Sequence, residues 1–318
     1  MPKDFSVIIT SYNRKQFLTS LIDSLLIYTK NYDSEIIVVK NFLDERIDSY
    51  LDSLPVINIY SKDTTLGGKL KDGISRSSGN IIFFVEDDDL FHPDKIPRVL
   101  NTFGNRASIS RIDFYHNAAL TFSDQIPNKI EVKNEVDVFK PSNNSRSLLN
   151  TLYHKHKAGF NVSSIVLDRN FAVESSDLLG KVKLTADTFL FFYAWEKRRN
   201  IAIDKNTLTF YRRVQQSKDT VNLEVFKMQL EDAELFEKVF TDKIIMENIQ
   251  KMKVYRELLY KIMSGEKSGL SYVWRIAKDL QWIKWDWFMF LLSVINSASN
   301  KLARKIYLRM LRSNSMFS

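Results

Sequence analysis

Four consecutive acidic residues, Glu86–Asp89, directly follow a short apolar run, Ile81–Val85. A continuous apolar run of this length is typical of a strand that is buried on both faces, as in a parallel sheet covered by helices. Four adjacent carboxylates repel one another, and burial adds to the cost of their charges. A bound divalent cation is the simplest compensation, and carboxylate oxygens suit Mg²⁺ or Mn²⁺. The pattern predicts a cation site that also receives substrate phosphate, although a solvated loop or the acidic start of a helix gives the same pattern.

The elements that must position these acids alternate through the first hundred residues. Apolar runs predict buried strands at 5–10, 35–39, 56–60 and 81–85. Apolar residues at helical spacing predict helices at 16–28, 44–54, 69–78 and 93–103. Strands alternating with helices favour an α/β fold with a doubly wound, mainly parallel sheet. The acid run then lies at the carboxyl edge of that sheet, where ligands of open α/β sheets bind.

Strand patterns continue to about residue 220 and then stop. Further strands are predicted at 111–122, 161–168, 201–203 and 208–211, with helices at 147–156 and 184–197. Beyond residue 220 only long helical patterns follow. We therefore expect a catalytic α/β domain over 1–220 and a helical C-terminal region over 221–318.

Composition excludes several classes of protein. The 318 residues contain no cysteine, which excludes disulfides, cysteine zinc sites and thiol catalysis. Neither a signal-peptide core nor an apolar run of membrane-spanning length is visible, so we expect a cytoplasmic location. The net charge of +8 suits an anionic partner such as a nucleotide sugar, a lipid headgroup or nucleic acid, and does not choose among them. The glycine spacings of a P-loop and of a nicotinamide-binding turn are both missing.

Residues 4–217 resemble a family 2 glycosyltransferase with the GT-A fold, through four stretches in the same order. These are SVIITSYNRKQFLTSLIDSLL, EIIVV, LGGKLKDGISRSSGNIIFFVEDDDLFHPDKI, and LTADTFLFFYAWEKR followed by TLTFYRR. They are similar to the first strand with its T-Y-N-R turn, the second strand, the glycine turn leading to the D-x-D motif, and the late E-D and Y-R segments. The resemblance implies transfer of a sugar, usually with inversion, from a nucleotide-diphosphate donor to a hydroxyl of a glycan or lipid-linked glycan. It also implies Mg²⁺ or Mn²⁺ as the cation.

The resemblance assigns metal ligands and a general base. Glu86 and Asp88 align with the two ends of the D-x-D motif and Asp89 extends it, so these three are the expected metal ligands. Asp187 matches the base that removes the acceptor proton. The family often has Glu before this Asp, but here it is Ala186. From its position alone, Asp187 is an acid in the first turn of a helix, where the helix dipole favours it.

The resemblance also implies a donor site at the ends of the first two strands. The expected donor residues are Thr10, Ser11, Tyr12, Arg14, Asn41, Gly68, Lys71, Asp87 and Arg212. The second strand of the family usually ends in Asp-Asp-Gly, whereas here Lys40 and Asn41 follow it. An amide can still pair with a pyrimidine edge, but a lysine cannot accept a hydrogen bond. Lys71 is expected to reach phosphate as a point charge and Arg212 as a fork; the alternative for both, and for Arg14, is an ordinary surface charge.

The C-terminal region combines aromatic and basic residues. Its crowded aromatic residues are Trp282, Trp285, Trp287, Phe288 and Phe290, and the only charges after Asp286 are those of Lys301, Arg304, Lys305, Arg309 and Arg312. This composition is typical of an interfacial helix on an anionic membrane surface, so a peripheral position on the cytoplasmic face is one interpretation. A helical hairpin packed on the catalytic domain and an oligomer interface are the alternatives. No recognised nucleic-acid-binding module is present, so we expect no nucleic-acid partner. The alternative functions are a nucleotidyltransferase and a non-catalytic relative that binds nucleotide or glycan.

Overall fold

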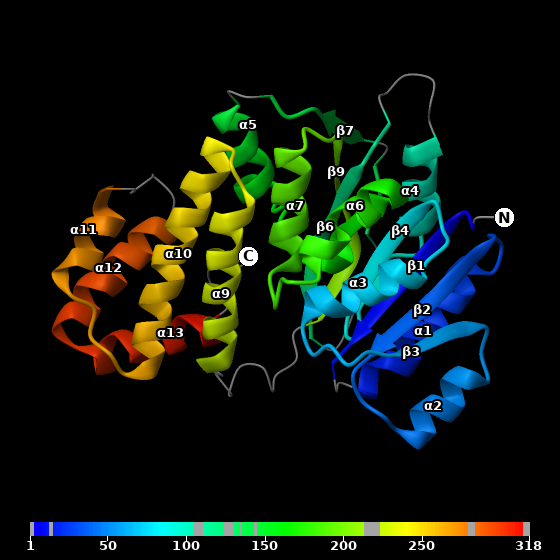
Figure 1. Ribbon diagram of the computed structural model, residues 1–318, viewed down its shortest axis with the longest axis horizontal. Coiled ribbons are helices and arrows are strands. Elements are labelled where there is room, and N and C mark those ends of the chain that lie inside the picture. Colours follow the sequence, from blue (N-terminus) through cyan, green and yellow to red (C-terminus); the bar gives the residue numbers. More distant parts are fainter. Residues whose placement is uncertain are drawn as a thin grey trace. The chain divides into compact units, whose positions relative to one another are not determined.

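The chain divides into two units, Met1–Arg213 and Val214–Ser318, in the computed structural model (Figure 1). The structure describes residues 3–12, 15–104, 111–123, 130–133, 135–142, 145–212, 223–278 and 284–313. In these residues, unit 1 holds a mixed sheet with helices, and unit 2 is helical.

Four parallel strands form the first half of the sheet. They are β1 (Phe5–Ser11), β2 (Ser34–Lys40), β3 (Val56–Tyr60) and β4 (Ile81–Glu86), in the order β3-β2-β1-β4. Every residue of β1 is buried, as expected for a central strand that is covered on both faces. Ser11 pairs with Lys40, and Thr10 pairs with Glu86. The ends of three strands therefore meet at one edge of the sheet.

The second half of the sheet is mixed in direction. Its strands are β5 (Leu90–Phe91), β6 (Phe114–Phe122), β7 (Val136–Phe139), β8 (Ile165–Asp168) and β9 (Ile201–Arg212). From β4 the order continues β8-β6-β9-β5, and β7 pairs with β9. β8 is antiparallel to both of its neighbours, whereas β6 and β9 are parallel. The predicted α/β fold is confirmed. The two short strands expected at 201–203 and 208–211 are parts of one strand, β9, which stays paired with β6 along its length through two shifts in register.

Helices cover both faces of this sheet. In unit 1 they are α1 (Lys15–Thr29), α2 (Glu45–Asp52), α3 (Leu66–Arg76), α4 (Lys95–Gly104), α5 (Arg146–Asn150), α6 (Arg169–Leu179) and α7 (Ala186–Glu196), with single turns at Thr151–Lys155 and Val162–Ser164. Successive side chains of a strand point to opposite faces. Ile8 of β1 lies so close to Gly73 of α3 that a Cβ there would be 2.4 Å from Ile8 Cγ2. Val7 and Ile9 belong instead to the apolar cluster that α1 joins.

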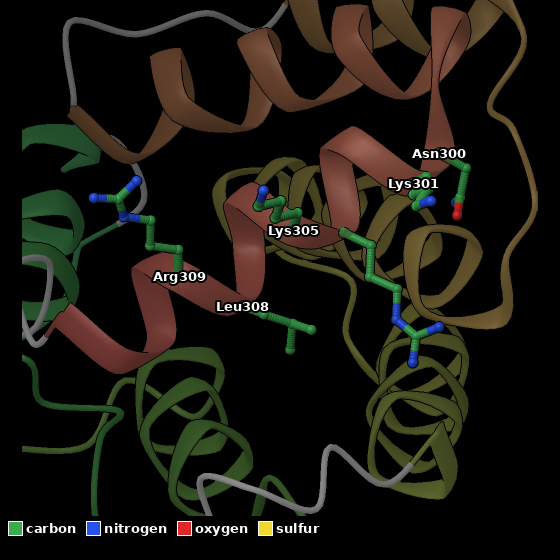
Figure 2. Close-up of a pocket in the computed structure, with 6 residues that line it drawn as sticks. Asn300, Lys301, Lys305, Leu308 and Arg309 are labelled. Atoms are coloured by element: carbon green, nitrogen blue, oxygen red, sulfur yellow. The ribbon is translucent and has the colours of Figure 1, made fainter.

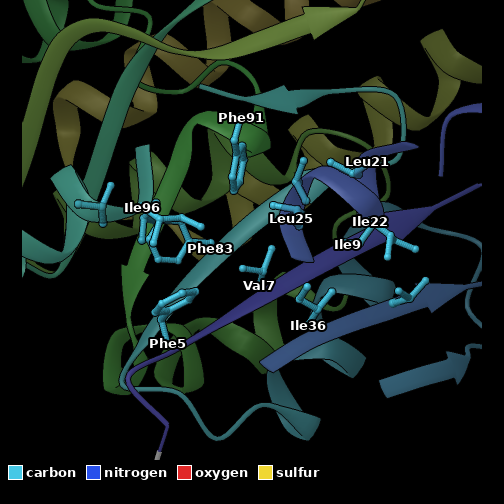
Figure 3. Close-up of a cluster of buried hydrophobic side chains, with 14 of the residues drawn as sticks. Phe5, Val7, Ile9, Leu21, Ile22, Leu25, Ile36, Phe83, Phe91 and Ile96 are labelled. Carbon is cyan, nitrogen blue, oxygen red and sulfur yellow. The ribbon is translucent and has the colours of Figure 1, made fainter. Parts of the chain in front are cut away.

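That cluster fixes the position of β4, the strand that ends at the acid run. Leu21 and Leu25 of α1 belong to it, together with Phe83 of β4 (Figure 3). The ring centroid of Phe83 lies 5.3 Å from that of Phe5 and 6.2 Å from that of Phe91. Phe83 is fully buried, so these aromatic contacts contribute to holding β4 against β1.

Lys40, at the end of β2, is a buried lysine with a structural role. Its Nζ lies 2.6 Å from Asp48 Oδ1 of α2 and donates to Phe42 O at 2.9 Å. Burial opposes ionisation of Asp48, but hydrogen bonds from Lys40, the Asp44 amide and Asn58 outweigh it and lower the pKa of Asp48 to about 2. The lysine that departs from the family pattern therefore fastens α2 to the end of β2.

Unit 2 has a hydrophobic core of its own. The described helices of this unit are α9 (Leu223–Val239), α10 (Lys243–Ser264), α11 (Leu270–Lys278), α12 (Lys284–Ala298) and α13 (Asn300–Ser313). The buried residues of the core include Leu258 and Ile262 of α10 and Leu292 of α12. Asp286 is buried as well, and it pairs with Lys251. Within the described ranges, no helix combines the length and the apolar composition that crossing a membrane requires.

Replacing Phe83 by alanine is expected to lower the free energy of unfolding of unit 1 by about 3–5 kcal/mol, because the surroundings of a buried ring only partly fill the space it leaves. Urea unfolding followed by circular dichroism measures the change. The control is Ile27→Ala on α1, whose residue is 63% exposed. Its expected change is within about 0.5 kcal/mol. Equal losses in the two variants would show that this cluster does not stabilise β4.

Asp48 is expected to titrate at a pKa of about 2 in the folded protein, and Lys40→Met is expected to move that pKa back toward the ordinary value. A carboxyl whose folded pKa lies below its unfolded pKa stabilises the fold fully above about pH 4 and loses that contribution as the pH falls toward the folded value. Carboxyl-carbon NMR during an acid titration measures the pKa directly. If the Asp48 pKa is the same in Lys40→Met, the ion pair is not its cause.

Candidate active site

The acid run forms a tight turn at the end of β4, against the turn that follows β1. Asp87 is fully buried, and its Oδ2 accepts hydrogen bonds from Ser11 Oγ at 2.6 Å and from Tyr12 N at 3.2 Å. The Asp87 amide donates to Thr10 O at 3.1 Å. Asp87 thus joins the two turns, and four residues expected at the donor site lie together.

Asp88 and Asp89 are buried in the same turn. Asp89 Oδ1 accepts the Arg212 amide at 3.0 Å, and Arg212 Nε donates to Asp88 O at 3.0 Å. Burial raises the pKa of Asp89 well above its usual value, and the carboxylates of Glu86 and Asp88 raise it further. Asp89 Oδ2 has no hydrogen-bond partner among the described residues. The turn therefore concentrates negative charge that its neighbours offset only in part.

A buried lysine lies next to this turn. Lys95, the first residue of α4, donates from Nζ to Ser163 O and, at 3.0 Å, to Thr209 Oγ1, and it lies 4.0 Å from the Phe91 ring centroid. Burial lowers the pKa of Lys95 well below its ordinary value, and the Asp89 carboxylate opposes that shift. Lys95 was not predicted from the sequence. The sequence did contain an indication of this contact. The helix dipole disfavours a lysine in the first turn of a helix, so a lysine at that position suggests an anionic neighbour.

The residues of the turn fit a cation that shares its coordination with a substrate. Among the residues that the structure describes, no three His, Cys, Asp or Glu side chains form a complete metal site. Mg²⁺ is usually bound by one or two carboxylates together with substrate phosphates, so a complete protein cage is not required. Asp88, Asp89 and Glu86 provide carboxylates of this kind. A cation would relieve the repulsion from Glu86 and Asp88, which adds to the effect of burial in raising the pKa of Asp89.

Asp187 lies in the first turn of α7 and is connected to the acid turn by one short segment. Its Oδ2 accepts the Asn161 amide at 2.7 Å, and its Oδ1 accepts the Thr188 amide at 2.7 Å. Asn161 Oδ1 accepts the Ser163 amide at 2.8 Å, and Ser163 Oγ accepts the Glu86 amide at 3.0 Å. Segment 161–163 therefore holds both the carboxylate of Asp187 and the start of the acid turn.

Lys71 was the lysine expected at the site, but Lys69, which was not predicted, is the one that reaches the turn after β1. Lys69 is buried, with Nζ 3.4 Å from Ser11 O and 4.7 Å from the Tyr12 ring centroid. Lys71 pairs with Asp177 of α6 at 2.8 Å, and both side chains are exposed. Residues two apart on a helix do not share a face, so only one of the two lysines can point to the site. Lys71 is thus directed toward α6 in this structure, and its contact with phosphate stays a prediction.

The remaining donor residues have mixed surroundings. Gly68 donates its amide to Thr65 Oγ1 at 3.1 Å, and a Cβ there would lie 2.0 Å from Asp63 Oδ2, so the close approach requires glycine. Asn41 follows β2, and its buried Oδ1 has no partner among the described residues. Arg14 lies outside the described residues.

The Arg212 guanidinium contacts other protein groups. Its central carbon lies 4.5 Å from the Phe17 ring centroid and 4.4 Å from the Phe122 ring centroid, and Nη1 donates to Ser123 O at 3.3 Å. With its two bonds to the acid turn, Arg212 fastens that turn to the end of β9. Its contact with a diphosphate stays a prediction.

Comparison with known proteins gives a family. Residues 6–166, just over half of the chain, match the family model described as glycosyl transferase family 2. An uncharacterized glycosyltransferase of Haemophilus influenzae is 33% identical over 117 residues, which are 36% of this chain and 38% of the relative. An uncharacterized glycosyltransferase of Nostoc sp. is 27% identical over 104 residues, 31% of this chain and 32% of the relative. The matched stretch thus spans less than half the length of these curated relatives.

Two solved structures share the fold over nearly the whole chain. S. aureus TarS 1–349 is 13% identical with a TM-score of 0.54, covering 99% of this chain and 93% of TarS. The mannosyltransferase PcManGT of Pyrobaculum calidifontis is 10% identical with a TM-score of 0.53, covering 100% of this chain and 88% of PcManGT. Identities this low show a common fold alone. Since the family model covers half of the chain, including β1, β2, β4 and the acid turn, the chain belongs to glycosyl transferase family 2.

Proposed function

We propose that the protein transfers a sugar from a nucleotide-diphosphate donor to an acceptor hydroxyl, with inversion and with bound Mg²⁺ or Mn²⁺. The observation that carries the proposal is that segment 161–163 holds the acid turn through Ser163 and Asp187 through Asn161. A carboxylate cluster for the donor and a carboxylate base for the acceptor are thereby fixed to one element. Family membership supports sugar transfer. The donor class is supported by structures of TarS with UDP-GlcNAc and of PcManGT with GDP-Man and Mn²⁺.

The donor half of the reaction is assigned to the edge where β1, β2 and β4 end. The turn at Ser11 and Tyr12 receives the nucleotide, and the amide of Asn41 suits a pyrimidine edge. Lys69 adds a cation beside the same turn. One or two of the carboxylates of Asp88, Asp89 and Glu86 would hold the divalent cation, and the donor phosphates would complete its coordination. When bound, that cation supplies neutralising charge to the departing diphosphate.

The acceptor half is assigned to Asp187. As the acceptor oxygen forms its bond to the anomeric carbon, the carboxylate takes the hydroxyl proton. The bond from the anomeric carbon to the diphosphate oxygen breaks, and its electron pair leaves with the diphosphate. Attack on the face opposite the leaving group inverts the configuration. The amides of Asn161 and Thr188 hold the carboxylate in place for this step, and Ala186 provides no second carboxylate beside it.

Asp187→Asn is expected to lower kcat for transfer by about 10²–10⁴-fold, because an amide cannot act as a general base. Donor binding should persist, since Asp187 acts on the acceptor. Asp88→Ala is expected to abolish both Mn²⁺-dependent donor binding and transfer. Calorimetry with UDP-sugars and GDP-sugars, with and without Mn²⁺, measures binding, and release of nucleoside diphosphate measures turnover.

The matched control for these variants is Asp177→Asn, which removes an exposed carboxylate of α6 and should change neither quantity. Wild-type transfer by Asp187→Asn would remove that residue from the mechanism. Donor binding without any turnover by the wild-type protein would favour a non-catalytic relative. Formation of diphosphate from a nucleoside triphosphate would favour a nucleotidyltransferase.

We also propose that unit 2 contacts an anionic membrane surface at the cytoplasmic leaflet, near a lipid-linked acceptor. Several aromatic residues of α12, including Trp285 and Phe288, pack on the core of unit 2. Trp287, Leu291 and Val294 remain exposed at helical spacing, so α12 presents one apolar stripe. An exposed stripe of this kind suits the boundary between lipid headgroups and acyl chains.

The basic face of α13 supports the same proposal. Lys301, Arg304, Lys305 and Arg309 line a hollow along α13 together with Leu308 (Figure 2). Among the described residues, no salt bridge involves these four cations. Basic residues near an anionic leaflet contribute about 1 kcal/mol each to binding.

Replacing Lys301, Arg304, Lys305 and Arg309 together by glutamine is expected to weaken binding to vesicles of phosphatidylglycerol and phosphatidylcholine by about a hundredfold or more. Sedimentation with the vesicles measures binding, which should also weaken with salt. The control replaces two other exposed lysines of unit 2, Lys227 and Lys267, by glutamine. Equal binding to vesicles of phosphatidylcholine alone would rule out the charge-based contact.

A further inference from the structure

A short segment beside Asp187 has an unusual backbone. Among the described non-glycine residues, positive φ occurs at Lys157 (53°), Asn161 (64°) and Arg198 (53°). Two of these three enclose residues 158–160. Such a conformation is unfavourable for a residue with a side chain, persists only where neighbours hold it, and clusters at functional sites.

Phe160, inside this segment, is exposed although its backbone is held. The residue is 41% exposed, which is unusual for a large apolar residue between buried neighbours. Its amide donates to Lys157 O at 2.9 Å, and its carbonyl lies 3.2 Å from His116 Nε2. A carbonyl only accepts, so this nitrogen donates. Burial lowers the pKa of His116 to about 4, so the ring is neutral near pH 7. Its single N–H is then at Nε2 and donates to the Phe160 carbonyl. The fold thus presents the Phe160 ring from a fixed backbone.

The exposed ring meets a second aromatic residue. The ring centroids of Phe160 and Tyr211 are 5.7 Å apart, at an interplanar angle of 64°. Tyr211 precedes Arg212, whose amide holds Asp89 of the acid turn. Phe160 precedes Asn161, whose amide holds Asp187. Each ring of the pair thus belongs to a residue that is next in sequence to one whose amide binds a carboxylate of the proposed site, Asp89 or Asp187.

We propose that Phe160 and Tyr211 form the acceptor subsite and that they bind the acceptor as a sugar ring. This inference rests on the proposed transferase function. An acceptor hydroxyl must lie between the anomeric carbon of the donor and the base, so the acceptor passes beside this pair. One face of a pyranose carries C–H bonds that pack on an aromatic surface, while its hydroxyls at the rim stay available to Asp187.

Two cations beside the acid turn, Lys95 and Arg212, are already engaged by protein groups, which favours a sugar ring over a phosphate at this subsite. A phosphate-bearing acceptor requires an available cation. Lys95 is buried and donates to Ser163 O and Thr209 Oγ1, and Arg212 is engaged by backbone carbonyls and two rings. A rigid aromatic residue, in contrast, binds a ring without a large loss of conformational entropy.

Saturation-transfer NMR on the full chain, in the presence of UDP and Mg²⁺, tests the proposal. The probes are the methyl glycosides of glucose, galactose, mannose and N-acetylglucosamine, with glycerol 3-phosphate as the comparison. Saturation of the protein is expected to reach the C–H protons of at least one glycoside. Phe160→Ala is expected to weaken the binding of that glycoside about three- to tenfold, because the aromatic ring supplies the contact. Phe160→Tyr keeps a ring at this position and is expected to retain the binding.

The control is Trp274→Ala on α11, which removes an aromatic residue that is 71% exposed and should leave the glycoside signal unchanged. The inference is overturned if no glycoside binds the wild-type protein, if Phe160→Ala behaves like the control, or if only glycerol 3-phosphate binds. A thermal unfolding curve for each variant shows whether it is folded. UDP binding by the wild-type protein is measured separately, so a failure of the proposed function is distinguishable from a failure of this subsite.

Discussion

Burial of several like charges at one edge of the sheet is the constraint on which the rest of the site depends. Asp87, Asp88 and Asp89 are all buried, and a carboxylate that loses its hydration needs hydrogen-bond donors or positive charge nearby. The fold provides these from separate parts of the chain. The turn after β1 binds Asp87, and the end of β9 binds Asp89. The strands and turns around the acids are therefore arranged as much by this charge as by apolar packing.

The same constraint explains the positions of the cations in unit 1. Lys95 offsets part of the charge of Asp89 from within the fold, while Arg212 binds the outer side of the turn through its backbone and side chain. Burial, with the nearby Glu86 and Asp88 carboxylates, keeps the pKa of Asp89 above its usual value despite these contacts. Several carboxylates that are close together and short of compensating charge suit a divalent cation. Lys40 belongs to a different pair, in which it binds Asp48 of α2.

Segment 161–163 holds the carboxylate of Asp187 through the amide of Asn161. Its hydrogen bonds to Glu86 and Asp187 join two parts of the chain that are about a hundred residues apart in the sequence. A segment with two anchored ends can sustain the strained backbone at Asn161 and keep the neighbouring Phe160 in a fixed place. The position of the Asp187 carboxylate and the presentation of the aromatic ring are thus consequences of the same local structure.

The sequence by itself determined the fold class, the strand that ends at the acids, and the placement of Asp187 in the first turn of a helix. Those features depend on local periodicity and on motifs that are contiguous in the chain. The roles of Lys69, Lys95 and Ser163, and the direction of Lys71 toward α6, were decided only by the tertiary structure. Which face of a helix meets the site depends on packing between elements. The sequence alone does not distinguish a lysine that faces a buried acid from a lysine that faces solvent. In unit 2, likewise, the aromatic crowd was visible in the sequence, but only the packed helices separate its core residues from the exposed stripe of Trp287, Leu291 and Val294.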